Sequence, residues 1–228
     1  MDLPSVSELS VSTQNYLKAI WSLQEWSSRP VTAGLVATRV GVKTSTVSGA
    51  LTKLAEQGLV LHDPYGSIEL TASGRSMALS MVRRHRLIET FLVEVLGYRW
   101  DQVDDEAEHL EHAVSDFMVE RIDEYLGHPT RDPHGDPIPD VTGEITMPAA
   151  SVLTDVEPGT IATIERISDR DPDLLKFLED QGLVPGVEIT VAPAAPFSDT
   201  IAVVTDDSSA PITLGRTASD ALFVKPRP

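Results

Sequence analysis

Apolar side chains recur at helical spacing along the first quarter of the chain. The pattern predicts three helices, over residues 12–25, 32–40 and 44–57. Ser12 or Thr13 is expected to cap the first helix. Two short apolar runs follow, residues 59–61 and 67–70, separated by the turn sequence from Asp63 to Gly66. Three helices and a β-hairpin in this order predict a winged helix-turn-helix, to which we assign residues 1–73.

The pattern then changes to longer amphipathic segments. Two helices are predicted, over residues 71–96 and 101–126, and the second is acidic on one side and apolar on the other. Residues 131–139 contain four Pro or Gly breaks in nine positions and end this region. Two helices bury too little surface to form a domain alone, so we expect residues 74–140 to be a helical domain that dimerises.

The last part of the chain has the pattern of short strands. Residues 141–156 are expected to form a linker that contains Pro148 and small residues. Five β-type runs follow, residues 160–167, 187–191, 201–205, 212–214 and 221–224, with one helical insert at 172–179. Short strands at this spacing predict a small β-barrel over residues 157–228. The predicted fold class is therefore mostly α with β.

Charge is distributed unevenly between these regions. The formal net charge is −17, but residues 1–90 carry nine Lys or Arg against seven Asp or Glu, a balance of +2. Residues 91–228 carry nine against twenty-eight, a balance of −19. DNA favours Lys and Arg on the face that it contacts. Because the acidity belongs to the later regions, the N-terminal domain is still expected to bind DNA.

Cysteine usage and hydropathy narrow the class further. The chain contains no cysteine, which excludes disulfides and thiolate metal ligands. No stretch approaches the roughly 20 apolar residues that cross a bilayer, and residues 1–12 lack the basic start and apolar core of a secretion signal. We therefore expect a cytoplasmic protein with no membrane partner.

Glu108, Glu111 and His112 are the strongest candidates for chemistry. Their spacing, i, i+3 and i+4, places two carboxylates and an imidazole on one face of the predicted second long helix. Oxygen-rich ligands with one nitrogen suit Mn²⁺ or Fe²⁺. A solvated acidic face is the alternative interpretation of these three residues.

His85 and Glu89 form a second i, i+4 pair on the preceding helix. Taken alone, the pair is more typical of a surface histidine and an ion-paired glutamate. Two consecutive helices that each present a histidine and carboxylates favour metal binding more than either does alone. His62, His128 and His134 fall in predicted turns without ligand spacing, so we assign them no role.

The third predicted helix carries the candidate DNA contacts. Its exposed side is expected to present small hydroxyls and one lysine, namely Thr44, Ser45, Thr46, Ser48 and Lys53. Lys43, Arg39 and the hairpin near Tyr65 are candidate contacts to the DNA backbone. An exposed helix rich in Ser and Thr is the alternative, but the helix-turn-helix context favours DNA.

We find no sequence signature of an enzyme. Phosphate-binding glycine loops, the metalloprotease His-Glu-x-x-His and the nucleophile elbow are all absent from the sequence. Glu111 and His112 could activate a metal-bound water, but nothing in the sequence favours hydrolysis over metal sensing.

Several segments resemble the diphtheria-toxin-repressor family of metal-dependent regulators, and its manganese-sensing branch in particular. They are Asn15-Tyr16-Leu17, Thr46-Val47-Ser48, Glu56 to Val60, Leu70 to Arg75, Arg84 to Glu89, Asp105 to Asp116, and Gly135 to Pro139. Together these segments span most of residues 12–140. The C-terminal region resembles the family's src-homology-3-like, FeoA-like barrel in pattern and position only.

The resemblance implies a homodimer with two metal sites in each subunit. The primary site would consist of Glu108, Glu111 and His112, joined by Asn15 from the first helix. The ancillary site would consist of His85, Glu89, Asp104, Asp171 and Asp173, the last two from the barrel. Glu108 stands where the iron-sensing branch carries cysteine, which favours Mn²⁺, with Fe²⁺ or Co²⁺ as further candidates.

Three departures from the family pattern limit what the resemblance implies. Asn15 stands where the family has Met or Asp, and Asp104 where the iron-sensing branch usually has His. Gly49 replaces a longer polar residue, so the operator sequence cannot be transferred.

The resulting hypothesis is a metal-activated repressor that binds double-stranded operator DNA of metal-uptake genes. A metal-independent winged-helix regulator is the main alternative, and a metal-dependent hydrolase is a distant third. Equilibrium dialysis with Mn²⁺ would separate the first two, and EDTA-sensitive hydrolysis would be needed to support the third.

Overall fold

The computed structural model describes residues 6–27, 29–62, 66–193, 198–206 and 210–227. The first helices form where the apolar pattern predicts them. A 3-10 turn, η1 (Val6–Glu8), precedes α1 (Val11–Glu25), α2 (Ala33–Val40) and α3 (Thr44–Glu56). Ser10 caps α1 by accepting a hydrogen bond from the Thr13 amide, so the predicted caps Ser12 and Thr13 are wrong. Gly41, at φ 71°, ends α2 in the left-handed conformation that glycine adopts readily.

A two-stranded hairpin, β1 (Val60–His62) and β2 (Ile68–Leu70), completes the N-terminal domain. The buried core beneath it combines all three helices with the hairpin: Leu17, Ile20, Val36, Val47, Leu51, Leu54 and Ile68. The predicted winged helix-turn-helix is confirmed. Tyr65, the predicted hairpin contact to DNA, lies outside the described residues.

The helical domain contains three helices instead of two. They are α4 (Ala72–Glu94), α5 (Trp100–Leu110) and α6 (Asp116–Tyr125). The single helix predicted over residues 101–126 is wrong, because the chain turns at residues 111–115. Ser115 starts a new helix there by accepting a hydrogen bond from the Met118 amide. Glu111 and His112 therefore lie at the end of α5 and in the turn, not on one continuous helical face.

The C-terminal domain is built on an antiparallel sheet of six strands in the order β3-β8-β4-β5-β6-β7. In chain order its elements are β3 (Ser151–Val152), η2 (Leu153–Asp155), β4 (Ile161–Ile167), α7 (Pro172–Asp180), β5 (Glu188–Ala192), β6 (Thr200–Thr205), β7 (Ile212–Gly215), α8 (Arg216–Ala221) and β8 (Leu222–Pro226). β3 lies within the segment expected to be a linker, and α8 has no counterpart in the prediction. The predicted fold class, including a FeoA-type barrel, is confirmed.

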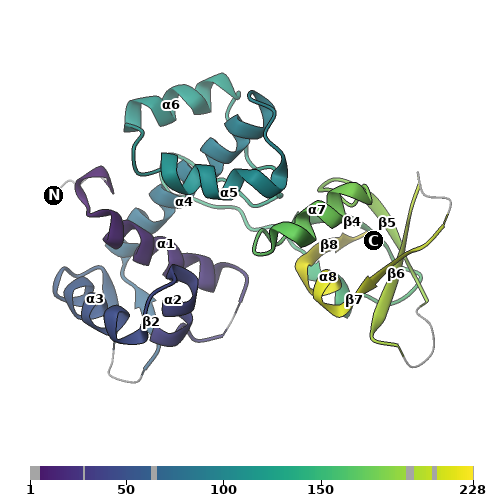
Figure 1. Cartoon of the computed structure of the whole chain (residues 1–228), viewed down its shortest axis with the longest axis horizontal. Coiled ribbons are helices and arrows are strands. Elements are labelled where there is room, and N and C mark those ends of the chain that lie inside the picture. The colour runs from purple at the N-terminus through teal and green to yellow at the C-terminus, as the bar shows by residue number, and fades with distance from the viewer. Residues whose placement is uncertain (1–5, 28, 63–65, 194–197, 207–209, 228) are drawn as a thin grey trace.

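The barrel contacts both other domains. Figure 1 shows α7 turned toward α5, and Arg99 pairs with Glu179 across this contact at 2.9 Å. At the end of α1, Trp26 packs on Phe223 with ring centroids 5.0 Å apart. The Arg166 guanidinium lies 4.4 Å from the Trp26 ring centre and 4.8 Å from that of Phe223. Among the described residues, no helix has both the length and the apolar composition that a membrane span requires.

Asp136 ties the three domains together at this contact. Its Oδ1 accepts hydrogen bonds from Trp26 Nε1 at 2.9 Å and from Arg166 Nε at 2.5 Å. We call Trp26, Asp136, Arg166 and Phe223 the Arg166 junction. It joins the end of α1, the segment after α6 and the barrel sheet, so the orientation of the N-terminal domain depends on all three.

Candidate metal centre

Helix α1 is shared by two domains. Leu17 and Ile20 are fully buried in the winged-helix core. Gln14 and Lys18, one helical turn apart, reach side chains of the helical domain instead. Figure 1 shows α1 with helices α2 and α3 of the winged helix on one side and helices α4 and α5 on the other. A change in the contacts of Gln14 or Lys18 therefore acts on the body of the DNA-binding domain.

Four side chains meet where α1 contacts α4 and the end of α5. We call Lys18, His85, Glu108 and Glu111 the α1 cluster. Lys18 Nζ donates to Glu108 Oε1 at 2.5 Å and to the two oxygens of Glu111 at 2.7 and 2.8 Å. His85 Nδ1 donates to Glu111 Oε2 at 2.6 Å. Glu111 is 0% exposed, so its carboxylate depends entirely on these partners.

Neighbouring charges favour the charged forms of three members of this cluster, Lys18, His85 and Glu111. Burial alone would lower the pKa of Lys18, but the carboxylates of Glu111 and Glu108 outweigh burial and raise it. Burial alone would raise the pKa of Glu111, but His85 and Lys18 lower it. Burial and Lys18 oppose a charge on His85, yet Glu89 and Glu111 raise the pKa of His85 well above its ordinary value. Lys18, His85 and Glu111 therefore carry their charges together in the folded protein.

His112 is oriented as a ligand beside this cluster. Gln14 Nε2 donates to the carbonyls of Val6 and Leu9, which fixes the orientation of the amide. Gln14 Oε1 then faces His112 Nδ1 at 2.6 Å, so Nδ1 must carry the proton and donate it. Burial lowers the pKa of His112 and keeps its ring neutral. The unprotonated Nε2 atom lies 3.5 Å from Glu111 Oε1 and has no hydrogen-bond partner among the described residues.

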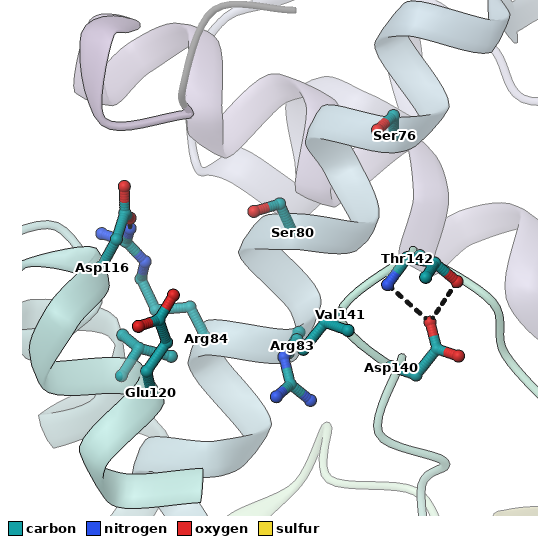
Figure 2. Close-up of a pocket in the computed structure, with 11 residues that line it drawn as sticks. Ser76, Ser80, Arg83, Arg84, Asp116, Glu120, Asp140, Val141 and Thr142 are labelled. Atoms are coloured by element: carbon teal, nitrogen blue, oxygen red, sulfur yellow. Dashed lines mark hydrogen bonds and ion pairs between the residues drawn. The ribbon is translucent and has the colours of Figure 1, made fainter.

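Arg84 holds the turn that carries Glu111 and His112. Its guanidinium donates to the carbonyls of Glu111 and Val114, both at 3.0 Å, and pairs with Asp116. Figure 2 shows Arg84 reaching toward Asp116 from α4, at one side of a cavity of about 310 Å³. The break between α5 and α6 is thus fixed by a side chain distant in sequence.

Asn15 supplies a further oxygen near the α1 cluster. Its Oδ1 is buried and has no hydrogen-bond partner within the described part of the chain. A cavity of about 230 Å³ opens here, lined by Asn15, Lys18, Asp104 and Glu108 among others. Asn15 therefore lies on the same side of α1 as the candidate ligands.

The ancillary set predicted from the resemblance is only partly brought together. His85 Nε2 lies 3.4 Å from both Glu89 Oε1 and Asp104 Oδ1. Asp171 instead caps α7, accepting hydrogen bonds from the amides of Asp173 and Leu174. Among the described residues, neither Asp171 nor Asp173 belongs to a group of three or more close ligand atoms.

A second buried group does occur, formed by Glu89, Asp132 and His134, and we call it the turn cluster. Its ligand atoms lie within 4.8 Å of one another. Glu89 Oε1 and His134 Nε2 form no hydrogen bond with any described residue. His134 is only 1% exposed, so the sequence-based assignment of no role to this residue missed a buried imidazole beside two carboxylates.

The turn at residues 131–137 builds this cluster. Asp132 Oδ1 accepts from the amides of His134 and Asp136, both at 2.9 Å, which curls the segment around its own carboxylate. Gly135 has φ 89°, and a Cβ there would lie 2.1 Å from the Glu165 carbonyl of β4. The alternating acids and imidazole of Asp132, His134 and Asp136 were the signal available in the sequence.

Two carboxylates at the turn cluster, Asp132 and Asp169, have pKa values shifted in opposite directions. Burial and the neighbouring carboxylates of Asp136 and Glu89 raise the pKa of Asp132 to about 8. Asp169, which follows β4, shows the opposite behaviour: although burial raises it, Arg39, His134 and Arg166 lower the pKa of Asp169 to about 2. Asp169 is thus a barrel carboxylate close enough to His134 for each to affect the pKa of the other.

The candidate DNA-binding residues are divided between two places. Thr44, Ser45, Thr46, Ser48 and Lys53 are exposed on α3, and Lys43 is exposed just before it. Ser48 Oγ donates to the Thr44 carbonyl, so that hydroxyl also serves its own helix. Arg39 lines the cavity beside Asn15, together with Asp104 and Glu108, and does not lie with the α3 residues.

Comparison with known proteins covers nearly the whole chain. Three family models match: "Iron dependent repressor, N-terminal DNA binding domain" at residues 8–68, "Iron dependent repressor, metal binding and dimerisation domain" at 71–140, and "FeoA domain" at 152–226. The "Iron-dependent repressor IdeR" of Mycobacterium leprae is 33% identical over 199 residues, 82% of this chain and 86% of that protein. The chain belongs to the diphtheria-toxin-repressor family.

Solved structures of the family agree with this assignment. The structure titled "Manganese-dependent transcriptional repressor complex with manganese" is 49% identical, with a TM-score of 0.90 over 94% of this chain and 100% of that one. The "manganese regulator SloR" is 30% identical, with a TM-score of 0.77 over 94% of this chain and 98% of that one. The predicted resemblance to this family and its manganese-sensing branch is confirmed.

The donor atoms of this family member suit a hard divalent cation. The α1 and turn clusters offer carboxylate oxygens and imidazole nitrogens, and the chain has no cysteine sulfur. Asn15, His112, Glu89 and His134 each contribute a buried polar atom without a hydrogen bond among the described residues. Buried polar atoms are normally satisfied, so these four fit ligands for Mn²⁺ or a similar ion.

Proposed function

We propose that this protein is a manganese-dependent transcriptional repressor of metal-homeostasis genes, with Fe²⁺ or Co²⁺ as alternative ions. It binds double-stranded operator DNA as a homodimer in the cytoplasm. The observation that carries the proposal is the position of α1. This helix packs into the winged-helix core and presents Asn15 and Gln14 to the metal ligands of the helical domain.

Two ion sites are proposed in each subunit. Glu108, Glu111, His112 and Asn15 form the first, with His85 adjoining it. Glu89, Asp132 and His134 form the second, and Asp169 provides the nearby carboxylate from the barrel in place of Asp171 and Asp173. His85 and Asp104 lie between the two. A bound divalent cation would supply the positive charge that these buried carboxylates share.

The protein's own residues explain how such sites control orientation. Ligands of the first site come from α1 and from the end of α5, so holding them together restricts how α1 can move. Restricting α1 selects one orientation of the DNA-binding domain from those that the metal-free protein samples. The recognition helix α3 shares one buried core with α1 and α2, so we expect it to move with them.

The dimer is proposed to form through α6. This helix exposes three large apolar side chains: Phe117 at 69%, Met118 at 47% and Tyr125 at 70%. An exposed apolar row of this kind is typical of an interaction surface. Two-fold pairing there would present two α3 helices, whose Thr44, Ser45, Thr46, Ser48 and Lys53, with Lys43, contact DNA.

Fluorescence anisotropy with a labelled promoter fragment tests the function. Added Mn²⁺ should tighten DNA binding of the full chain, and Glu111→Ala should remove this response. Glu106→Ala, an exposed glutamate on the same helix α5, is the matched control and should respond like wild type. DNA binding that is indifferent to Mn²⁺ in all three proteins would favour a metal-independent winged-helix regulator instead.

A further inference from the structure

The first proposed site already holds a cation that belongs to the protein. Lys18 is 8% exposed, and its ammonium lies 2.5 to 2.8 Å from one oxygen of Glu108 and both oxygens of Glu111. An ammonium has three donors and no lone pair, so Lys18 cannot be a metal ligand. It occupies the carboxylate oxygens that a divalent ion needs.

The ammonium and a divalent ion exclude one another from these oxygens. Protein carboxylates hold hard divalent ions at about 2.0 to 2.6 Å. An ion bound to both Glu108 and Glu111 would therefore stand where Lys18 Nζ stands, or within direct contact of it. Two cations at that separation in a buried site repel strongly. Lys18 must withdraw before both carboxylates can bind an ion.

The structure provides space for this withdrawal. The cavity of about 230 Å³ beside Lys18 is lined by Asn15, Ser22, Arg39, Asp104 and Glu108, among others. The lysine side chain is long and flexible. The side chain of Asp104 is 44% exposed, so it offers the displaced ammonium a carboxylate close to solvent.

We propose that Lys18 is an intramolecular competitor, which holds Glu108 and Glu111 together in the metal-free protein and sets the ion concentration at which the first site fills. The inference rests on the proposed function. Lys18 keeps the ligands assembled and their charges balanced without an ion, and it weakens ion binding by the free energy needed to displace it.

Metal affinity of the full chain measures this competition. Equilibrium dialysis should show Mn²⁺ binding at least about tenfold tighter in Lys18→Met than in wild type, since the competing charge is gone. Lys18→Arg keeps the charge and should show no such gain. Lys176→Met, an exposed lysine on α7, is the matched control and should bind like wild type. Folded Lys18→Met that binds Mn²⁺ no more tightly than wild type overturns the proposal.

Thermal melting supplies a second readout. Metal-free Lys18→Met should melt at a lower temperature than wild type, because Glu111 loses one of its two buried counter-ions. With saturating Mn²⁺ the two proteins should melt at closer temperatures. An equal difference with and without Mn²⁺ would show that Lys18 does not leave the carboxylates, and would overturn the competition.

Nitrogen-15 NMR of the wild-type lysine ammonium groups keeps the test independent of the variant's folding. Metal-free protein should give one ammonium signal protected from solvent exchange, from Lys18. Stoichiometric Cd²⁺, a diamagnetic ion, should abolish that protection. A protected signal that persists with Cd²⁺ bound overturns the inference alone. Wild type that binds neither Mn²⁺ nor Cd²⁺ would instead overturn the proposed function.

Discussion

The α1 cluster and the turn cluster differ in how the negative charge of their buried carboxylates is balanced. Both bury carboxylates next to an imidazole, and each lies within the proposed metal centre. In the α1 cluster, Lys18 supplies a fixed positive charge directly to Glu108 and Glu111. In the turn cluster, burial and like charges push the pKa of Asp132 to about 8, so a proton supplies the balance.

This difference teaches that buried carboxylates of similar composition can respond to different conditions. A proton is exchanged with solvent, whereas the lysine ammonium is part of the chain and carries its charge wherever it moves. Occupancy of the turn cluster should therefore follow pH more closely than occupancy of the α1 cluster.

Arg86 is a buried cation next to Asp132 of the turn cluster, and removing it should have the largest effect on stability. Its guanidinium is bound by Glu25 at 2.7 and 2.9 Å and lies 3.4 Å from both Asp132 and Asp136. Arg86→Met removes the ion-pair partner of the buried Glu25 carboxylate and leaves Asp136 with Arg166 as its only paired cation among the described residues, which should lower the free energy of unfolding by about 3 to 5 kcal/mol. Urea denaturation of the metal-free protein measures the change.

Arg216 provides the control for this experiment. Its side chain is 68% exposed and pairs with Asp220 on the surface of α8. Arg216→Met should cost less than about 1 kcal/mol. Equal effects of the two substitutions would mean that the turn cluster does not depend on Arg86.

The proton on Asp132 predicts a pH dependence of stability. The pKa of Asp132 is higher in the fold than in the unfolded chain, so the fold retains a proton that the unfolded chain releases. The stability from this group is complete below about pH 4 and is lost as pH rises through about 8, by at most about 1.4 kcal/mol per pH unit. Asp132→Asn keeps the oxygen that accepts the amides and should flatten this slope. Urea midpoints at pH 5 to 8 in EDTA compare the two proteins, and identical slopes would contradict the assignment.

Gln14 should affect the first proposed ion site alone. Gln14→Met removes the acceptor that fixes the proton on His112 Nδ1, and loss of such a supporting hydrogen bond typically weakens metal binding about 10- to 100-fold. Mn²⁺ titration of the full chain should then show one weakened site and one unchanged. Gln102→Met, at an exposed position of α5, controls for the substitution itself. Two sites weakened equally would show that the clusters are not independent.

Trp26→Phe should produce the smallest effect. Phenylalanine keeps the ring against Arg166 and Phe223 but loses the hydrogen bond to Asp136, which should cost about 1 kcal/mol of unfolding free energy. Because Asp136 lies beside Asp132, Mn²⁺ affinity of the turn cluster should change slightly while that of the α1 cluster does not. Dialysis and urea denaturation on the same variant test both statements.

Local pattern predicted most of the fold. Helical periodicity and the turn sequence between two short apolar runs were sufficient for the winged helix, because these signals act within a few residues. The break between α5 and α6 was missed because it depends on Ser115 and on Arg84, which reaches it from another helix. α8 is short and has no strong periodicity, so nothing local distinguished it.

Helical spacing predicted only the part of the candidate site whose residues are close together along the chain. Glu108 and Glu111, and His85 and Glu89, were found from i+3 and i+4 spacing. Asp132 and His134 were missed because a turn and the barrel bring them to Glu89, and neither contact leaves a periodic pattern. The place of Lys18 among the ligands is equally a product of tertiary packing.

Helix α1 also has a mechanical consequence. Its 15 residues give a rod about 22 Å long at 1.5 Å per residue, so a tilt of about 5° displaces one end by about 2 Å. In the proposed dimer the two subunits are related by a two-fold axis, so their two α3 helices are displaced in opposite directions. Successive major grooves on one face of DNA are about 34 Å apart. Because α1 is one continuous helix, a side-chain movement at the metal site can change the distance between the two recognition helices of the dimer without an intervening hinge.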